Sequence, residues 1–159
     1  MFCSKLDTPI GMLLIKSTAE TLTFIGYDED EIEENPGDLT EYAKLQMEDY
    51  FKGNRSSFDF PLNQSGTEFQ KKVWKELLNI EPGRPISYAS LSKKMNNPLA
   101  IRAIASANGK NKLMIAVPCH RVIGSTGELV GFAGGLWRKK WLLEHEAGMM
   151  KMGQATLEF

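Results

Sequence analysis

The first 27 residues contain short apolar runs separated by polar positions. Leu13–Lys16 and Thr21–Tyr27 are rich in Leu, Ile, Thr and Phe, and residues 17–20 between them are small or polar. Runs of this length with turn residues between them predict two antiparallel strands joined by a turn. Phe2–Leu6 has a similar character, and we expect it to supply a third strand.

A helical pattern follows an acidic segment. Residues 28–37 are mostly acidic and end in a Pro-Gly pair, which predicts a loop. From Leu39 to Phe51 the apolar residues largely follow helical spacing, and Gly53 ends the pattern. The first sixty-odd residues therefore predict a small unit of strands and one helix. The turn-rich residues 61–66 are the best candidate for a linker.

The second part of the chain has mainly helical patterning. Thr67 has the side chain expected of an N-cap, for a helix through Leu78 that buries an apolar face. Residues 82–85, with the sequence Pro-Gly-Arg-Pro, predict a rigid turn.

Two short helices follow this turn, and a tight corner joins them. Ser87 can cap a helix over residues 88–95, Asn96-Asn97 makes the corner, and the next helix runs from about Pro98 to Ala107 and ends at Asn108-Gly109. Such a pair resembles a helix-turn-helix, whose second helix usually meets a DNA groove. By itself this signal is weak, because many helical hairpins bind nothing.

Charge is distributed unevenly along the chain, although its net charge is only -1. Residues 1–65 carry 5 Lys/Arg and 13 Asp/Glu, a balance of -8, and residues 66–159 carry 14 and 7, a balance of +7. We expect an α/β domain at residues 1–64 and a helix-turn-helix-containing domain at residues 65–159. The basic second half of the chain could bind a polyanion such as nucleic acid. From the charge alone, a surface whose lysines and arginines only face solvent is an equally good interpretation.

Composition excludes several other classes. Apolar residues make up 42% and charged residues 25%, as in soluble globular proteins, and no apolar run approaches the roughly 18 residues that span a bilayer. The start lacks the pattern of a signal peptide. Two cysteines are too few for a disulfide framework, and His120 and His145 do not complete a zinc motif. We expect a reduced, cytoplasmic protein with no cofactor, no metal and no membrane contact.

The segment that carries most information surrounds Cys119. An apolar run over residues 115–117, which we expect to be extended, leads to Pro118-Cys119-His120. A thiol becomes a strong nucleophile only as a thiolate, which needs a nearby base or positive charge. Adjacency does not make His120 that base, because neighbouring side chains on an extended chain point to opposite sides. A buried cysteine is most often a small packing residue, so catalysis remains one of two alternatives here.

Residues 118–122 (Pro-Cys-His-Arg-Val) are the motif of the methylated-DNA–protein-cysteine methyltransferases, the alkylguanine-DNA alkyltransferase family. The chain resembles this family from about Thr67 to Gly148 in one register, and the first sixty residues resemble it more loosely. The motif and five further blocks have fitting spacings, so a chance match is very improbable. These further blocks are Phe69-Gln70 with Val73-Trp74, Pro82-Gly83 with Ile86-Ser87-Tyr88, Arg102-Ala103-Ile104 with residues 108–111, residues 131–136, and residues 141–146.

The resemblance implies an α+β fold. A small N-terminal sheet-plus-helix domain, ribonuclease H-like, would precede a mainly helical, winged helix-turn-helix-like alkyltransferase domain. It also implies a DNA repair protein that moves the alkyl group from the 6-oxygen of guanine to Cys119, with the 4-oxygen of alkylated thymine as a further candidate. A thioether is a very poor leaving group, so each molecule would act once. The partner would be double-stranded DNA containing alkylated guanine, bound by a monomer, and cooperative binding stays open.

The resemblance also assigns catalytic roles. His120 would act as the base through a bridging water, and Glu146 would orient the imidazole, which is the logic of a catalytic triad. Tyr88 would donate a proton to a ring nitrogen of the leaving guanine. Asn111 would be a hinge between the recognition helix and the active-site segment. Without the resemblance, Glu146 would be read as a solvated carboxylate and Tyr88 as a core residue.

Other residues would bind the substrate and the DNA. Main-chain groups of Cys119, Val122 and Ala133 would read the edge of the guanine, and Gly134 would let the backbone approach closely. The target base must leave the stack, and Arg102 would fill the gap from the minor groove. Lys139 would lie near the site or, equally, on the surface. Exposed lysines would attract phosphates, namely Lys93, Lys94, Lys110 and Lys112.

The chain departs from the family pattern at three of these positions. Ala133 stands where serine is frequent and Phe132 where tyrosine is frequent, so the alkyl preference could differ. Lys110 replaces the more usual arginine beside the hinge, which keeps the charge but loses the planar fork. Two other functions compete with transfer: a lesion-sensing DNA-binding protein without chemistry, and a cysteine hydrolase using Cys119 and His120.

Overall fold

The computed structural model describes residues 1–27 and 32–157. The chain divides into two compact units. The first comprises Met1–Ser65 together with Lys112–Ala116, and the second comprises Gly66–Asn111 and Val117–Phe159. Residues 28–31, the first part of the acidic segment 28–37 that we expected to be a loop, lie outside the described residues.

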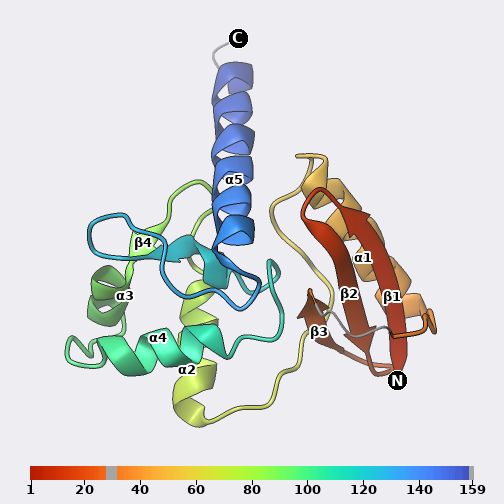
Figure 1. Ribbon diagram of the computed structural model, residues 1–159, viewed down its shortest axis with the longest axis horizontal. Coiled ribbons are helices and arrows are strands. Elements are labelled where there is room, and N and C mark those ends of the chain that lie inside the picture. Colours follow the sequence, from red (N-terminus) through yellow and green to blue (C-terminus); the bar gives the residue numbers. More distant parts are fainter. Residues whose placement is uncertain (28–31, 158–159) are drawn as a thin grey trace. The chain divides into compact units, whose positions relative to one another are not determined.

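The first unit contains an antiparallel sheet in the order β1-β2-β3 (Figure 1). Its strands are β1 (Phe2–Thr8), β2 (Gly11–Ser17) and β3 (Leu22–Gly26), so all three predicted strands are confirmed. The turn between β1 and β2 uses Gly11 at φ 117°, a backbone conformation that glycine adopts readily.

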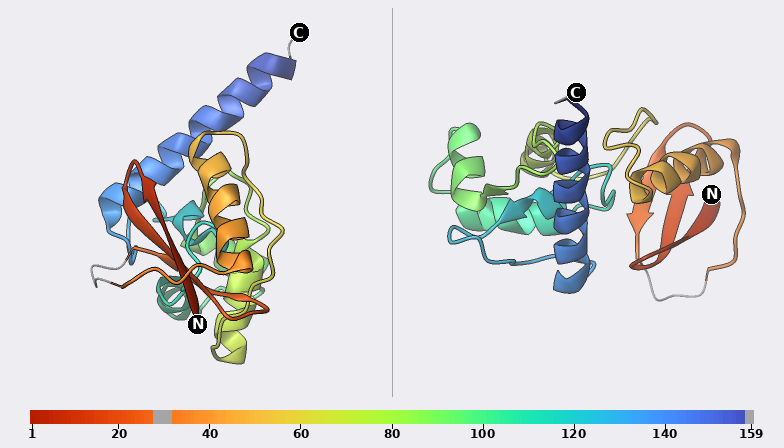
Figure 2. Two further views of the ribbon diagram at one scale, coloured as in Figure 1. Left: turned by 90° about the vertical axis from the view of Figure 1, so that its right-hand side faces the viewer. Right: turned by 90° about the horizontal axis from the view of Figure 1, so that it is seen from above.

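One helix, α1 (Asp38–Phe51), covers a face of this sheet, as Figures 1 and 2 show. Its buried apolar residues Ala43, Met47 and Tyr50 follow the helical spacing that the sequence predicted. Ser4 of β1 donates a hydrogen bond of 2.8 Å to the hydroxyl of Thr40, which links the sheet to the start of the helix.

A segment from late in the sequence completes the first unit. Ile25 of β3 donates its backbone N–H to Lys112 O at 2.9 Å, and Met114 donates to Ile25 O at 2.9 Å. Leu113 lies between them, 1% exposed, as part of the core. Residues 112–114 therefore pair with the edge of the first sheet, although the residues on both sides of the segment 112–116 belong to the second unit.

The second unit begins with α2 (Glu68–Leu77), and its predicted cap is confirmed. The hydroxyl of Thr67 accepts a hydrogen bond from the backbone N–H of Gln70, and the side chain of Gln70 accepts one from the N–H of Thr67. Trp74 is buried, and its indole N–H donates to Ala107 O at 2.9 Å. This bond ties α2 to the end of α4.

The expected helix-turn-helix is formed by α3 (Tyr88–Lys94) and α4 (Ile101–Gly109). Ser87 caps α3 as expected, and Asn96 makes the corner with φ 56°. The expected start of the second helix at Pro98 is wrong, because Ala100 donates its N–H to Asn97 O at 3.1 Å and so closes a separate turn.

The remaining elements of the second unit surround the Cys119 motif. The two-residue strand β4 (Ile86–Ser87) pairs in parallel with β5 (Val122–Ile123), and the 3-10 helix η1 (Cys119–Arg121) immediately precedes β5. The chain then forms a long loop and ends in α5 (Leu136–Leu157), whose C-terminal part extends beyond the other elements of its unit (Figure 2). None of the described helices is long and apolar enough to cross a membrane.

Candidate active site

Cys119 lies at the start of η1, in a compact turn. Its backbone N–H donates to Val117 O at 2.8 Å, and Arg121 N–H donates to Pro118 O at 3.1 Å. Ile115, a few residues earlier, has φ 72°. The expectation of an extended run up to Cys119 is therefore wrong, because these local bonds bend the chain. The side chains of Cys119 and His120 therefore need not point to opposite sides, as they would on an extended chain.

Two asparagine side chains donate hydrogen bonds to the backbone of this turn: Asn108, near the end of α4, and Asn111, just after it. Asn111 Nδ2 donates to Val117 O at 2.8 Å and so joins the two ends of the segment 112–116. Asn108 Nδ2 donates to Cys119 O at 3.2 Å. Both side chains are buried, at 6% and 2% exposed respectively. The backbone on either side of the thiol is therefore fixed by side-chain amides.

The thiol itself is 5% exposed. Burial raises the pKa of Cys119 above its ordinary value, although a hydrogen bond from Asn111 and the positive charge of Lys139 act in the opposite direction. The resting group is therefore a protonated thiol at neutral pH. It needs a proton acceptor before it can act as a nucleophile.

Lys139 of α5 is fully buried, so a position on the surface is wrong for it. Its ammonium donates to Val130 O at 2.7 Å. Burial lowers the pKa of Lys139 from 10.5 to about 8, and the negative charge of the Cys119 thiolate acts to raise it. A buried cation close enough to interact with the thiolate favours the charged form of the sulfur.

His120 and Glu146 meet in the interior of the second unit. His120 Nε2 lies 2.9 Å from Glu146 Oε2, and both side chains are fully buried. Among the described residues, His120 Nδ1 has no hydrogen-bond partner. The carboxylate therefore faces one ring nitrogen, and the other nitrogen is left able to accept a proton.

Arg121 completes this cluster. Its guanidinium donates through Nε to Glu146 Oε1 at 2.9 Å and through Nη2 to Oε2 at 2.8 Å, and Nη1 donates to Ile80 O at 2.7 Å. This planar, two-point contact sets the orientation of the carboxylate. Burial would raise the pKa of Glu146, but the charges and hydrogen bonds of His120 and Arg121 outweigh it and lower the pKa from 4.5 to about 2.

Tyr88 lies at the start of α3 and is 8% exposed. Its phenolic oxygen accepts a hydrogen bond of 3.1 Å from Asn108 Nδ2. Burial raises the pKa of Tyr88, the hydrogen bond from Asn108 lowers it, and the charge of Cys119 raises it, with a net increase above 10. Tyr88 is therefore protonated at neutral pH and able to donate.

The loop before α5 contains the residues expected to read the guanine. Gly131 and Gly135 have φ of 53° and 92°, conformations that favour glycine. Arg138 Nη1 donates to Gly134 O at 2.9 Å. Ala133 is exposed and Gly134 is buried, while Val122, at the start of β5, is fully buried. Thus α5 holds the loop through the side chains of Arg138 and Lys139, and Ala133 is exposed within it.

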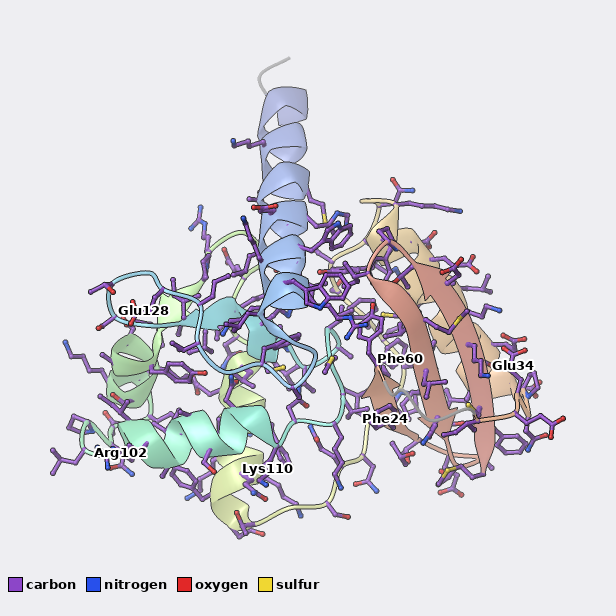
Figure 3. All side chains as sticks on the ribbon, in the orientation of Figure 1. Phe24, Glu34, Phe60, Arg102, Lys110 and Glu128 are labelled. Atoms are coloured by element: carbon purple, nitrogen blue, oxygen red, sulfur yellow. The ribbon has the colours of Figure 1, made fainter. Side chains whose placement is uncertain are left out.

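The surface of α4 combines small residues with basic and apolar ones. Arg102 is exposed in its first turn and Lys110 is exposed just after its end, and Figure 3 shows them near opposite ends of the helix. Leu99, in the corner before α4, is 97% exposed. Ala103 and Ser106 are exposed between the two basic residues. Lys93 and Lys94 are exposed at the end of α3, and Lys112 is exposed in the segment assigned to the first unit.

Two family models match the chain. Residues 68–148 match "6-O-methylguanine DNA methyltransferase, DNA binding domain", and residues 1–64 match the "ribonuclease-like domain" of the same family. The chain belongs to this methyltransferase family. The α+β fold expected from the resemblance, a small N-terminal sheet unit followed by a mainly helical unit, is confirmed.

Individual relatives of the methyltransferase family agree with this assignment. A methylated-DNA–protein-cysteine methyltransferase of Methanosarcina acetivorans is 39% identical over 153 residues, which cover 92% of this chain and 98% of that protein. The crystal structure of the Mycobacterium tuberculosis O6-methylguanine methyltransferase matches with a TM-score of 0.84 at 38% identity, covering 93% of each chain. A structure of the M. tuberculosis protein in complex with DNA matches with a TM-score of 0.83 at 39% identity, covering 91% of this chain and 92% of that chain.

The second unit connects the predicted catalytic residues in two sets. Asn108 links Tyr88 to the backbone of Cys119, and Asn111 holds Val117 just before it. His120 faces Glu146. Sequence reasoning missed Arg121 and Asn108. An available signal for Arg121 was a charged residue in an otherwise apolar stretch, because such a residue is buried only with a partner. Across residues 1–27 and 32–157, no three His, Cys, Asp or Glu side chains are grouped so as to hold a metal ion.

Proposed function

We propose that this methyltransferase repairs alkylated DNA by moving the alkyl group from the 6-oxygen of guanine to Sγ of Cys119, once per molecule. The observation that carries this proposal is a buried thiol whose neighbour in the chain, His120, lies 2.9 Å from the buried carboxylate of Glu146. The Methanosarcina relative carries the name methylated-DNA–protein-cysteine methyltransferase, which describes the same acceptor chemistry.

Activation of the thiol begins at His120. Because the pKa of Cys119 is raised, the thiol must lose its proton during the reaction. His120 accepts this proton at Nδ1 through a bridging water, and its Nε2 faces the ionised Glu146. Arg121 prevents the carboxylate from rotating. Lys139 stabilises the thiolate as it forms.

The transfer is a direct displacement. A bond forms between sulfur and the alkyl carbon while the bond from that carbon to the guanine oxygen breaks. Its electron pair passes to the purine, which receives a proton from Tyr88 at a ring nitrogen. Because the thioether product has no easily expelled group, the thiol is not regenerated. The 4-oxygen of alkylated thymine presents the same bond and is a second substrate in this proposal.

The target base has to leave the duplex before it can reach a buried thiol. Extrusion costs a few kcal/mol, and less for a poorly paired lesion. We assign Arg102 to the space that the base leaves, because it is exposed in the first turn of α4. The small side chains along α4 permit a close approach to a groove. The exposed lysines at 93, 94, 110 and 112 contribute attraction to phosphates that does not depend on sequence.

Once extruded, the base is recognised mainly by backbone groups. Cys119, Val122 and Ala133 contribute them, Gly134 lets the backbone approach closely, and Asn111 holds the segment that carries Cys119. Because a backbone group does this work at Ala133, the absence of a serine hydroxyl there changes the alkyl preference more than the reaction itself. All these groups come from a single chain, so a monomer suffices. The free thiol requires a reducing compartment, which we propose to be the cytoplasm.

Intact mass measurement tests the proposal. The wild-type protein is incubated with a duplex containing O6-methylguanine, and one added methyl group is expected on a peptide that contains Cys119. The variant Cys119→Ala should gain no mass but keep its affinity for DNA. Binding without mass gain by the folded wild-type protein would indicate a lesion sensor, and continuous product release would indicate a hydrolase. Either result contradicts the proposal.

A further inference from the structure

The side-chain amide of Asn108 contacts both the proposed proton donor, Tyr88, and the backbone of the nucleophile, Cys119. Asn108, in the last turn of α4, donates from the same Nδ2 atom to Tyr88 Oη at 3.1 Å and to Cys119 O at 3.2 Å. Its side chain is only 2% exposed. The proton donor and the backbone of the nucleophile are therefore connected through a single side-chain atom.

The chemistry of the two partners determines the direction of both hydrogen bonds. A backbone carbonyl can only accept, so the Asn108 atom next to Cys119 O has to be the amide nitrogen. An amide nitrogen has no lone pair available to accept, so the phenolic oxygen of Tyr88 must accept from it. The phenolic hydrogen of Tyr88 is therefore directed away from Asn108 and is available for donation.

Packing alone gives no reason for an asparagine at this place. Asn108 Oδ1 is buried and has no hydrogen-bond partner among the residues that the structure describes. A buried acceptor without a partner is unfavourable. An apolar side chain of similar volume would avoid it, but would leave the buried Cys119 O without the donor that Asn108 supplies. The amide is therefore retained despite an unfavourable feature, which points to a function for its N–H groups.

We propose that Asn108 is a positioning residue that makes Tyr88 a dedicated proton donor and ties this donor to the backbone of Cys119. The inference rests on the proposed transfer reaction and adds a residue to it. In the reaction, His120 takes the thiol proton and Tyr88 supplies one to the purine. Re-equilibration between the resulting imidazolium and phenolate restores both groups, so the net change is the alkyl group moved from guanine to sulfur and one hydrogen moved from sulfur to guanine.

Two electrophiles distinguish proton donation from simple support of the turn. Transfer from O6-methylguanine in a duplex requires a proton for the leaving purine. Alkylation of Cys119 by iodoacetamide does not, because iodide leaves without one. The variant Asn108→Leu should slow transfer from the duplex by about 10-fold, a part of the roughly 100-fold or more that a general acid contributes, and should change the iodoacetamide rate by less than about 3-fold. Asn79→Leu, on an exposed residue after α2, is the matched control.

A double-mutant cycle with Tyr88→Phe tests whether Asn108 acts through Tyr88. Tyr88→Phe should slow transfer by about 100-fold. In that background, Asn108→Leu should add less than about 3-fold, because residues that act as a unit are not additive. Asn108→Asp keeps the shape but lacks the N–H donor and accepts the phenolic hydrogen instead, so it should slow transfer as much as Tyr88→Phe. Thermal unfolding of each variant verifies that it is folded.

Three results would overturn the inference while leaving the proposed function intact. These are equal slowing of both electrophiles by Asn108→Leu, an undiminished effect of that substitution in the Tyr88→Phe background, and full activity of a folded Asn108→Asp variant. Absence of methyl transfer by the wild-type protein would instead contradict the proposed function, and the inference with it.

Discussion

Replacement of Glu146 by glutamine tests the buried cluster behind His120. The carboxylate is fully buried, accepts two hydrogen bonds from Arg121 and lies 2.9 Å from His120 Nε2. Glu146→Gln preserves the shape of the side chain and removes its charge. Arg121, which is 5% exposed, is then left as a buried cation with no carboxylate to neutralise it.

The expected loss of stability can be obtained in two ways. The lowering of the pKa of Glu146 from 4.5 to about 2 corresponds to about 3 kcal/mol, at about 1.4 kcal/mol per pH unit. Removing one partner of a buried ion pair costs about 3–5 kcal/mol. Both considerations predict that Glu146→Gln lowers the free energy of unfolding by about 3–5 kcal/mol at pH 7.

The pH dependence of this loss has a definite sign. The pKa of Glu146 is lower in the folded protein than in the unfolded chain, so its contribution is fully present above pH 4.5 and is lost as the pH falls from 4.5 toward 2. The difference between wild type and Glu146→Gln should therefore become smaller as the pH falls below 4.5.

Urea unfolding followed by tryptophan fluorescence measures this difference. The three tryptophans, Trp74, Trp137 and Trp141, all belong to the second unit, so the signal reports on the unit that contains the cluster. Glu144→Gln on the same helix is the matched control, because Glu144 is exposed and pairs with Lys140 only at 4.0 Å. A loss below about 1 kcal/mol for Glu146→Gln, as expected for a surface pair, would refute the reasoning.

Two further predictions concern single residues. Lys139→Met removes a buried cation whose pKa is lowered from 10.5 to about 8. Because the unfolded chain binds more protons than the folded protein between these pH values, the free energy of unfolding of the wild type relative to the variant should rise by about 3 kcal/mol from pH 7 to 10.5. A constant difference in urea unfolding over this range would contradict the prediction. Arg102→Ala should slow transfer from duplex DNA by about 10-fold or more but leave the reaction with free O6-methylguanine unchanged, since only the duplex requires base extrusion; equal losses in single-turnover assays would contradict the stack-filling role.

Local patterns in the sequence were enough to predict most elements. The three strands, α1 and α2 arise from apolar spacing, and the caps Thr67 and Ser87 form as expected. These features depend on interactions between residues a few positions apart, which the sequence displays directly. The Cys119 motif and its spacing to five other blocks likewise identified the family. The start of α4 could not be predicted in this way, because Pro98 suits a turn as well as a first helical turn.

The arrangement of the candidate site depends on contacts between distant parts of the chain. Glu146 reads as an exposed carboxylate in its own helix, yet it is buried against Arg121, 25 positions earlier. Lys139 reads as a surface cation and is fully buried. Asn108 reads as a helix end and connects Tyr88 with Cys119. The sequence by itself determined most of the helices and strands and which thiol carries the motif. Only the tertiary structure decided which polar groups share the low-dielectric interior around His120 and Cys119, because their pairing depends on packing between distant segments rather than on local spacing.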